Sequence, residues 1–292
     1  MKIKKAIITC AGFGTRFLPV TKSIQKEMLP ILERPLIDYV VDDCVKAGIE
    51  EIIFVINIHN YQVLHFYREN HRLYEYLEKM HKLPLYEQIA HLHDKAIFHF
   101  VKQTDSDPYG TAVPVLLAKE YVKNEDAFLV LMGDDFIYRH DQGSSIAEMI
   151  AEYESAAAKA ALMGIEKPDE LLSKYGVMKT ETNAGHQFLA GIVEKPAPGE
   201  APSNLVNISK YILSKEIWPI LDAQPVNPDS GELYITDTVQ ALAKQEKVLV
   251  HQPKGEYLDG GYPLGWLLAN LTVAKDRPEI WSVVKDFVTK NS

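Results

Sequence analysis

Short apolar segments that alternate with helix-like segments constrain the fold of this 292-residue chain most strongly. Residues 4–12 (KKAIITCAG) predict a buried strand that ends in glycine, residues 36–48 predict an amphipathic helix, and residues 50–57 (EEIIFVIN) predict a second buried strand. The same alternation continues in AIFHFVKQ, AVPVLLAKEYV and AFLVLMGDD. We therefore expect an α/β fold with a doubly wound, mostly parallel mixed sheet, in which an active site lies beyond the carboxyl ends of the strands.

Residues 59–95 interrupt this alternation with a polar, aromatic and helix-prone insertion. It holds six of the ten histidines, but there is no HExxH motif, and we interpret these residues as packed or exposed helix histidines rather than metal ligands. Later helices are expected with Thr236 or Asp237 as an N-cap and after Pro263. We expect one domain over residues 1–292, with a helical insertion at about 59–95 and a C-terminal part at about 160–292.

The net charge of −9 argues against a surface that attracts nucleic acid or anionic lipid through a general positive field. No apolar stretch approaches about 18 residues, so we expect no membrane span, and the N-terminal apolar run is too short for a signal peptide. The two cysteines, Cys10 and Cys44, form neither a CxxC motif nor a disulfide framework, which favours a cytoplasmic protein. Because the net charge is negative, any anion-binding site must depend on a local cluster of cationic residues.

The segment TCAGFGTRFLPVTKSIQKEMLPI (9–31) is a candidate for such a site. Glycines directly after a strand let backbone amides approach phosphate oxygens. Arg16, Lys22 and Lys26 add three cations, a combination that suits a polyphosphate whose charge builds up on a leaving group. Phe17 replaces the third glycine of a dinucleotide-binding turn, and the Gly-Lys-Ser/Thr of a P-loop is absent. The alternative is a tight turn with solvated basic residues, but the clustering of cations in an acidic chain favours a binding loop.

A pair of acids ends the segment LVLMGDDF, where a buried strand leads into Asp134 and Asp135. Two carboxylates at the carboxyl end of a strand suit Mg²⁺, which prefers a few carboxylate oxygens together with substrate phosphates. Paired acids also occur in plain turns, so this segment alone leaves both interpretations open.

The loop at 9–31 resembles the signature loop of sugar-1-phosphate nucleotidylyltransferases, and its KEMLP ending is similar to that of the bacterial UTP–glucose-1-phosphate uridylyltransferases. The resemblance continues in family order through PLIDYVVDDCVKAGI, GDD, YGV, VEKP, SNL, GELYITD and YLDGGYPLGW, and so covers nearly the whole chain. It implies a Rossmann-like nucleotidyltransferase fold and an in-line attack of a sugar-1-phosphate oxygen on the α-phosphorus of UTP, with release of pyrophosphate. Such a reaction depends on positioning and charge neutralisation, since it needs no covalent enzyme intermediate.

The resemblance also implies roles within the nucleotide site. Arg16 would neutralise the departing β- and γ-phosphates, Lys26 would reach toward the α-phosphate, and Lys22 has a weaker claim to a role. Mg²⁺ is implied as cofactor, with Asp134 and Asp259, in YLDGG, as its carboxylate ligands. A side-chain amide can pair with the imide edge of uracil, and a glycine leaves room for the ring. The residues implied to bind the nucleotide are Ala11, Gly12, Gly14, Thr15, Gln103, Gly110 and Asp134.

A third set of residues is implied for the sugar. Glu194 and Lys195, adjacent in GIVEKP, would point to opposite faces if the strand stays regular. Glu194 would then contact sugar hydroxyls and Lys195 the sugar phosphate, so that Lys195 joins Arg16, Lys26 and Asp134 in the implied catalytic set. An ion pair at the end of the strand is the structural alternative. Two further sugar-side positions match the family, Gly176 in KYGVM and Asn204 in PSNL.

Several residues depart from the pattern of the bacterial uridylyltransferases. Gly-Leu-Gly-His-Ala-Val is usual where this chain has PYGTAV (108–113), so Pro108 and Thr111 replace a glycine and a histidine. Gln25 stands in place of a proline, and Ser209 in place of a glycine. Further departures are Tyr234, Val206 and Tyr262–Pro263.

Three functions remain open from the sequence. The first is synthesis of UDP-glucose from UTP and glucose 1-phosphate, or of a related UDP- or dTDP-sugar. The second is a non-catalytic nucleotide-binding paralogue, which loss of Arg16 or Lys26 would have favoured. The third is a nicotinamide oxidoreductase, which the missing third glycine and Asn57, in place of an acidic residue after the second strand, argue against. Because family members commonly assemble, the resemblance implies a homo-oligomer, a dimer or a dimer of dimers.

Overall fold

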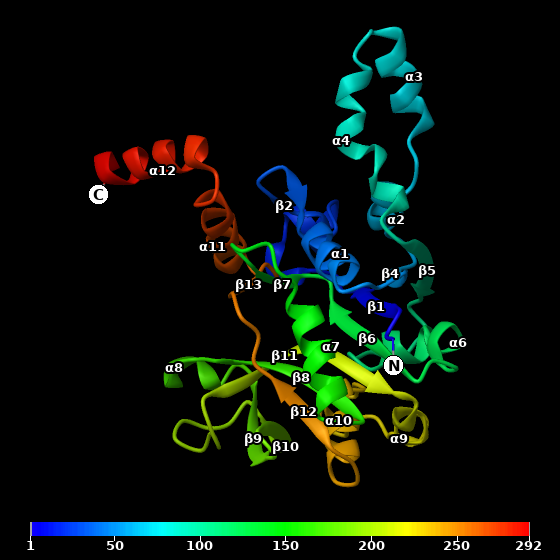
Figure 1. Ribbon diagram of the computed structural model, residues 1–292, viewed down its shortest axis with the longest axis vertical. Coiled ribbons are helices and arrows are strands. Elements are labelled where there is room, and N and C mark those ends of the chain that lie inside the picture. Colours follow the sequence, from blue (N-terminus) through cyan, green and yellow to red (C-terminus); the bar gives the residue numbers. More distant parts are fainter. Residues whose placement is uncertain (1, 292) are drawn as a thin grey trace.

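A nine-stranded sheet forms the centre of the structure, a computed structural model that describes residues 2–291 (Figure 1). Its strand order is β5-β4-β1-β6-β11-β8-β12-β10-β9. The bounds of these strands are Lys5–Cys10 (β1), Glu51–Asn57 (β4), Ile97–Gln103 (β5), Ala127–Met132 (β6), Ala160–Glu166 (β8), Gly176–Asn183 (β9), His186–Glu194 (β10), Leu205–Ser214 (β11) and Val248–His251 (β12).

Most strands of this sheet run in one direction. β5, β4, β1 and β6 pair in parallel, and β12 is parallel to β8. β11 is antiparallel to both β6 and β8, and β10 is antiparallel to both β12 and β9, so β11 and β10 run against the other strands. The prediction of an α/β fold with a doubly wound, mostly parallel mixed sheet is confirmed.

Helices cover both faces of the sheet because neighbouring residues of a strand point to opposite sides. Their bounds are Leu36–Lys46 (α1), Gln62–Tyr67 (α2), His71–Lys79 (α3), Glu87–Ala90 (α4), Val113–Leu117 (α5), Lys119–Val122 (α6), Ser145–Ser155 (α7), Asp169–Leu172 (α8), Trp218–Ala223 (α9), Ile235–Ala243 (α10), Pro263–Ala274 (α11) and Pro278–Asn291 (α12). Ile8 of β1 belongs to a hydrophobic cluster with α1, α7 and α11, whereas Ile7 belongs to a cluster with α5, α9 and α10. Within residues 2–291, no helix combines the length and the apolar composition that a membrane span requires.

The predicted helical insertion lies between β4 and β5 and projects from the body as α2, α3 and α4 (Figure 1). Its base is packed, since Tyr67 is buried and its ring stacks on Phe54 of β4 with 5.4 Å between the ring centroids. The Tyr67 hydroxyl donates to Asp38 of α1, and Lys95, at the other end of the insertion, donates to the same carboxylate. Both ends of the projection are therefore anchored to α1.

A separate two-stranded ribbon carries acids of the predicted site. β7 (Asp135–Tyr138) is antiparallel to β13 (Glu256–Asp259), and Asp135 lies directly opposite Asp259. This register brings the GDD segment beside a residue from far along the chain. The glycine-rich loop, residues 11–29, connects β1 to a second ribbon formed by β2 (Pro30–Ile31) and β3 (Arg34–Pro35). Its short 3-10 turns are Thr15–Phe17, Val20–Lys22 and Lys26–Met28.

Three local features differ from the predictions. The N-cap of α10 is Tyr234, because its extended backbone (φ −97°, ψ 129°) immediately precedes the helix, and Thr236 and Asp237 lie in the first turn. β10 ends at Glu194, and Lys195 adopts φ 46°, so the strand is not regular through both residues. α12 was not predicted as a helix separate from α11.

Candidate active site

A cleft of about 530 Å³ opens at the carboxyl ends of β1 and β6, where a doubly wound sheet is expected to place a site. Its walls come from the glycine-rich loop after β1, from the acids after β6 and at the end of β13, and from the segment around residue 110. The cleft brings together all the residues predicted for the nucleotide and the metal, which are Ala11, Gly12, Gly14, Thr15, Arg16, Lys26, Gln103, Gly110, Asp134 and Asp259.

Two glycines shape the loop that follows β1. Gly14 has φ 64°, and a Cβ there would lie 3.0 Å from Cγ2 of Thr21. The Thr21 hydroxyl donates to the Gly14 carbonyl over 2.8 Å and so closes the turn. A Cβ at Gly12 would lie 3.5 Å from Nζ of Lys26. The positive φ angle therefore favours glycine at position 14. At position 12, the absence of a side chain leaves space beside the Lys26 ammonium group.

The two cationic side chains that line the cleft, Arg16 and Lys26, differ in their contacts. Arg16 is exposed and forms no hydrogen bond or ion pair with the rest of residues 2–291. Lys26 Nζ donates to Asp134 Oδ2 over 2.6 Å and lies 3.8 Å from Glu27 Oε1. Burial opposes the charge on Lys26, but the two carboxylates outweigh it and raise its pKa. Lys22 is exposed and does not line the cleft.

The carboxylates of Asp134 and Asp259 converge on Gly261. A Cβ at position 261 would lie 2.7 Å from Asp134 Oδ2 and 3.0 Å from Asp259 Oδ1. Burial alone would raise the pKa of Asp134, but Lys26 outweighs it and the pKa lies below its ordinary value. Burial raises the pKa of Asp259, and the negative charge of Asp134 raises it further. A hydrogen bond from the Gly261 amide acts in the opposite direction, but the pKa remains above its ordinary value. Hard oxygen donors that converge on an open point fit a divalent cation such as Mg²⁺.

A buried ion pair beneath the cleft holds the segment that carries the acids. The Lys210 ammonium of β11 donates to the Asp135 carboxylate, and the Tyr257 hydroxyl donates to the same carboxylate over 2.8 Å. The side chains of Lys210 and Asp135 are 4% and 8% exposed. Burial raises the pKa of Asp135 to about 6, against the attraction of Lys210. Lys210 was not predicted as part of the site. The sequence did contain a signal for it, because a lysine within the apolar strand at 205–214 needs a buried partner for its charge.

Gln103 and Gly110, which were predicted as a base-facing pair, lie on one wall of the cleft. Gln103 Nε2 donates to the Pro108 carbonyl over 3.4 Å. Gly110 has φ 126°, and a Cβ there would lie 2.2 Å from the Leu233 carbonyl oxygen. Thr111, which replaces the usual histidine, accepts a hydrogen bond at its hydroxyl from the amide of the first residue of α10, over 3.0 Å. This wall is therefore built on the start of α10.

The residues predicted for the sugar lie outside the lining of this cleft. Gly176 pairs with Glu194 across β9 and β10, and a Cβ at position 176 would lie 2.9 Å from Glu194 Oε2. Glycine therefore makes room for this carboxylate. Asn204 is engaged elsewhere, since its side-chain amide donates to Asp169 Oδ1 over 3.0 Å.

The backbone of Lys195 is held by Tyr175. Its backbone amide donates to the Tyr175 carbonyl over 3.0 Å. Burial raises the pKa of Tyr175, and the charges of Asp259 and Arg16 act on it in opposite senses. Tyr175 therefore fixes the backbone of Lys195 and directly precedes Gly176, another of the predicted sugar-side residues.

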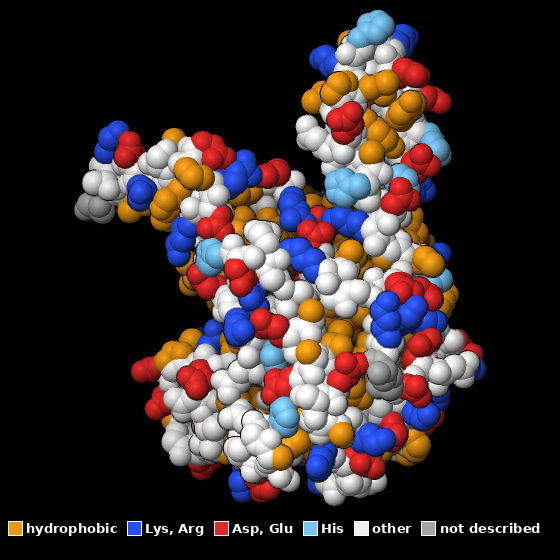
Figure 2. Space-filling model, in the orientation of Figure 1, with side chains coloured by type: hydrophobic (Ala, Val, Ile, Leu, Met, Phe, Trp, Pro, Cys, Tyr) orange, Lys and Arg blue, Asp and Glu red, His pale blue; other side chains and the backbone are white. Residues whose placement is uncertain are grey.

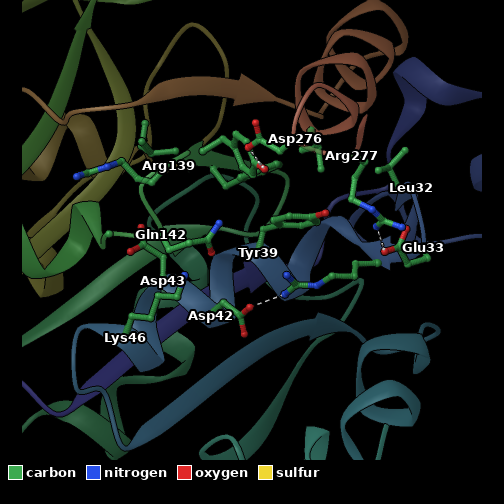
Figure 3. Close-up of a pocket in the computed structure, with 16 residues that line it drawn as sticks. Leu32, Glu33, Tyr39, Asp42, Asp43, Lys46, Arg139, Gln142, Asp276 and Arg277 are labelled. Atoms are coloured by element: carbon green, nitrogen blue, oxygen red, sulfur yellow. Dashed lines mark hydrogen bonds and ion pairs between the residues drawn. The ribbon is translucent and has the colours of Figure 1, made fainter. Parts of the chain in front are cut away.

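A second cavity, of about 310 Å³, lies between α1, the β2–β3 ribbon and the end of α11 (Figure 3). The three arginines that line it already have carboxylate partners. Arg34 Nη2 lies 2.5 Å from Asp42 Oδ2, Arg139 Nη2 lies 2.6 Å from Asp141 Oδ2, and Arg277 Nη1 lies 2.7 Å from Glu33 Oε1. Because these charges are neutralised within the chain, this cavity suits a triphosphate less well than the cleft that contains Arg16.

Comparison with known proteins identifies relatives over nearly the whole chain. A family model described as nucleotidyl transferase matches residues 5–276. The UTP–glucose-1-phosphate uridylyltransferase of Bacillus subtilis is 34% identical over 281 residues, which cover 96% of this chain and 94% of the relative. A UTP-bound UGPase from Acinetobacter baumannii has a TM-score of 0.87 at 32% identity, with 99% of this chain and 100% of that chain covered. A UDP-glucose pyrophosphorylase complexed with UDP-glucose has a TM-score of 0.80 at 32% identity, with 94% and 99% covered.

Replacing Lys210 with methionine should lower the free energy of unfolding by about 3–5 kcal/mol, because it leaves the Asp135 carboxylate buried without its cation. Urea denaturation at pH 8 measures the loss. The matched control is the double variant Lys210→Met/Asp135→Asn, which should recover most of the lost stability because both charges are then removed. A double variant as unstable as the single one would show that the unpaired carboxylate is not the cause.

Proposed function

The chain belongs to the nucleotidyl transferase family, and on that premise we propose that it transfers the uridylyl group of UTP to glucose 1-phosphate, forming UDP-glucose and pyrophosphate. The observation that carries this proposal is the cleft at the ends of β1 and β6, in which Arg16 and Lys26 face two converging carboxylates. Relatives named for this reaction match nearly the whole chain, and similar solved structures include a UTP-bound protein and a complex with UDP-glucose.

The proposed reaction is an in-line attack of the sugar-phosphate oxygen on the α-phosphorus of UTP. The backbone of Gly12, Gly14 and Thr15 would hold the triphosphate. The guanidinium of Arg16, which has no partner within residues 2–291, would bind the departing β- and γ-phosphates. Lys26 would neutralise charge at the α-phosphate, and its ammonium already lies in the cleft. These groups stabilise charge that develops on the leaving pyrophosphate without forming a covalent intermediate.

Asp134 and Asp259 are the residues that would hold Mg²⁺ in this proposal. Their carboxylates converge beside Gly261, where the chain has no side chain. When bound, Mg²⁺ would neutralise phosphate charge that the two carboxylates would otherwise repel. Lys26 contributes a further positive charge next to Asp134.

Selection of the base and of the sugar would depend on two other regions. Gln103 would pair with the imide edge of uracil, and Gly110 would leave room for the ring. Glu194 would bind sugar hydroxyls and Lys195 the sugar phosphate, and the Lys195 backbone amide is held by the Tyr175 carbonyl. The other sugar-side residues in the proposal are Gly176 and Asn204.

We also propose that residues 1–292 work as one nucleotidyltransferase domain in the cytoplasm. Both parts of the chain contribute residues to the cleft, because Asp134 faces Asp259, which belongs to the C-terminal part at about 160–292. Cys10 and Cys44 are both free and buried, as expected for a protein in a reducing compartment.

Pyrophosphate release from UTP or dTTP with a panel of sugar 1-phosphates, with and without Mg²⁺, tests the proposed reaction. Release confined to UTP with glucose 1-phosphate, and dependent on Mg²⁺, is expected. Release with dTTP or with another sugar phosphate would replace the proposed substrates with those of a related nucleotidyltransferase. Binding of UTP without release from any pair would indicate a non-catalytic paralogue.

Lys26→Ala should lower kcat about 100-fold, because the ammonium acts on charge that is largest in the transition state. Binding of UDP-glucose, measured by calorimetry, should weaken by less than about tenfold. Lys22→Ala is the matched control, since Lys22 belongs to the same loop but is exposed and does not line the cleft, and it should keep the wild-type kcat. Equal losses of turnover and of UDP-glucose affinity in Lys26→Ala would contradict the role given to Lys26.

α12 presents an apolar stripe that is largely exposed, and none of the residues of this helix is fully buried within residues 2–291. Val283, Phe287 and Val288 are 66%, 67% and 56% exposed, and with Ile280 and Val284 they recur at the spacing of one helix face. The helix projects from the body as an arm (Figure 1), and apolar side chains are visible along it (Figure 2). An unpartnered stripe of this kind marks an interaction surface.

The charges of α12 favour a second copy of the chain as the partner. Glu279, which also pairs with Arg277 over 2.7 Å, lies near the start of the helix and Lys290 near its end, on the same side of the stripe. When two α12 helices pair antiparallel about a two-fold axis, Glu279 of each copy lies opposite Lys290 of the other copy. We therefore propose a homodimer joined by two α12 helices, which could assemble further into a dimer of dimers.

Phe287→Glu should convert this dimer to a monomer, because it places a charge within the apolar stripe. Sedimentation velocity at micromolar concentration measures the oligomeric state. The control is Ser282→Glu, which adds the same charge on the opposite face of α12 and should leave the dimer intact. A monomeric wild-type protein, or a dimer that survives Phe287→Glu, would refute the α12 interface.

A further inference from the structure

Two glutamines join the glycine-rich loop to the base of the helical insertion. Gln62, the first residue of α2, accepts a hydrogen bond from the Gln25 backbone amide over 2.7 Å and donates to the Ser23 carbonyl over 2.9 Å. The Gln25 side chain, which is buried, donates to the Cys10 carbonyl at the end of β1 over 2.7 Å. These three hydrogen bonds, called here the Gln25–Gln62 junction, connect β1, the loop and the insertion.

Within residues 2–291, the Gln25–Gln62 junction supplies every hydrogen bond between residues 12–25 and the chain outside the loop. The other hydrogen bonds of this segment are internal, such as the one from Thr21 to Gly14. Parts of the segment are exposed, with Phe13 at 61% and Leu18 at 60%. A segment with few buried contacts opens readily unless it is held at specific points. The junction therefore holds the loop at the residue immediately before Lys26.

Gln62 is a firm support because the base of the insertion is itself anchored. Val63 and Tyr67, which follow Gln62 in α2, are buried. The Tyr67 hydroxyl donates to Asp38 over 3.1 Å, and Lys95 Nζ donates to the same oxygen of Asp38 over 2.7 Å. Movement of Gln62 away from the loop would disturb this buried network.

Gln25 makes the junction a property of this sequence. Proline is usual at this position in the family that the loop resembles, and Gln25 has φ −62° and ψ 133°, which proline also adopts. A proline would keep the backbone but would have no amide hydrogen for Gln62 and no side-chain donor for the Cys10 carbonyl. Gln25 thus replaces the stiffness of a proline with two hydrogen bonds, one of which depends on the insertion.

We propose that Gln62 is a positioning residue for the transfer reaction, acting through the Gln25 amide to hold Lys26 in the cleft. Gln25 precedes Lys26 in the chain, so a displacement of Gln25 moves the Lys26 backbone directly. A small misplacement of a charge that must meet the reacting phosphate lowers the rate more than it weakens nucleotide binding. The kinetic part of this inference rests on the proposed function, whereas the mechanical part does not.

Gln62→Ala tests the junction by two independent measurements. In the free protein, hydrogen–deuterium exchange of residues 12–31 should become about tenfold faster, while exchange in the central sheet stays unchanged. With UTP and glucose 1-phosphate, kcat should fall about tenfold and the KM for UTP should change by less than about twofold. Gln62→Glu keeps an oxygen for the Gln25 amide, and its kcat should remain within about threefold of wild type.

The matched control is Gln252→Ala, because Gln252 also forms a bond between two glutamines, donating to Gln187 over 3.0 Å, and neither residue lines the cleft. Both measurements should stay at the wild-type values. When Gln62→Ala is added to Gln25→Pro, the further fall in kcat should be less than about twofold, because proline at position 25 has no amide hydrogen for Gln62 to accept.

Wild-type exchange and wild-type kcat in Gln62→Ala would overturn the inference, as would fully additive losses in the double variant. A loss of kcat that Gln252→Ala reproduces would also overturn it, because the effect would then be general. If the wild-type protein releases no pyrophosphate from UTP, the proposed function fails. The exchange measurement on the free protein still decides in that case whether Gln62 holds the loop.

Discussion

The contact between the Lys26 ammonium and the Asp134 carboxylate joins the two halves of the candidate site. Lys26 belongs to the loop after β1 and Asp134 to the segment after β6, and they meet because β1 and β6 are neighbouring parallel strands whose carboxyl ends share one edge of the sheet. The two side chains are 20% and 21% exposed, so the pair keeps its charges within reach of a ligand. In the proposed reaction, Lys26 exchanges this carboxylate for a phosphate oxygen, and Asp134 then becomes available to Mg²⁺.

This accessible pair depends on buried groups beneath it. Asp135, next to Asp134, is bound by Lys210, and the β7–β13 ribbon sets Asp259 opposite Asp135. The pairing of β11 shifts register between Asn207 and Tyr211, and Ser209 within this bulge has φ 54°. A bulge changes the direction of the side chains near it, and here Lys210 points to the acids. The left-handed backbone also gives a physical reason for the glycine that is usual at this position, since a serine is more strained there.

The sequence predicted those parts of the site that are continuous in the chain or that follow a family pattern. Arg16 and Lys26 stand out as cations after a glycine-rich turn, and Asp134 as an acid at the end of a buried strand. The convergence of Asp134 with Asp259 could be expected only from the resemblance, because YLDGG does not indicate its distant partner. Lys210 and Gln62 were missed, since their roles arise from hydrogen bonds between segments that are far apart in sequence. For Lys195, a regular strand was assumed, but β10 ends one residue earlier.

A crystal structure of the protein with UTP and Mg²⁺ would show directly whether Arg16 and Lys26 bind the triphosphate. We expect the triphosphate in the cleft against the glycine-rich loop, with Arg16 on the β- and γ-phosphates and Lys26 Nζ on an α-phosphate oxygen instead of Asp134. The metal ion would then lie between the carboxylates of Asp134 and Asp259. A nucleotide bound elsewhere, with Lys26 still on Asp134 and Arg16 facing solvent, would contradict these roles of Arg16 and Lys26.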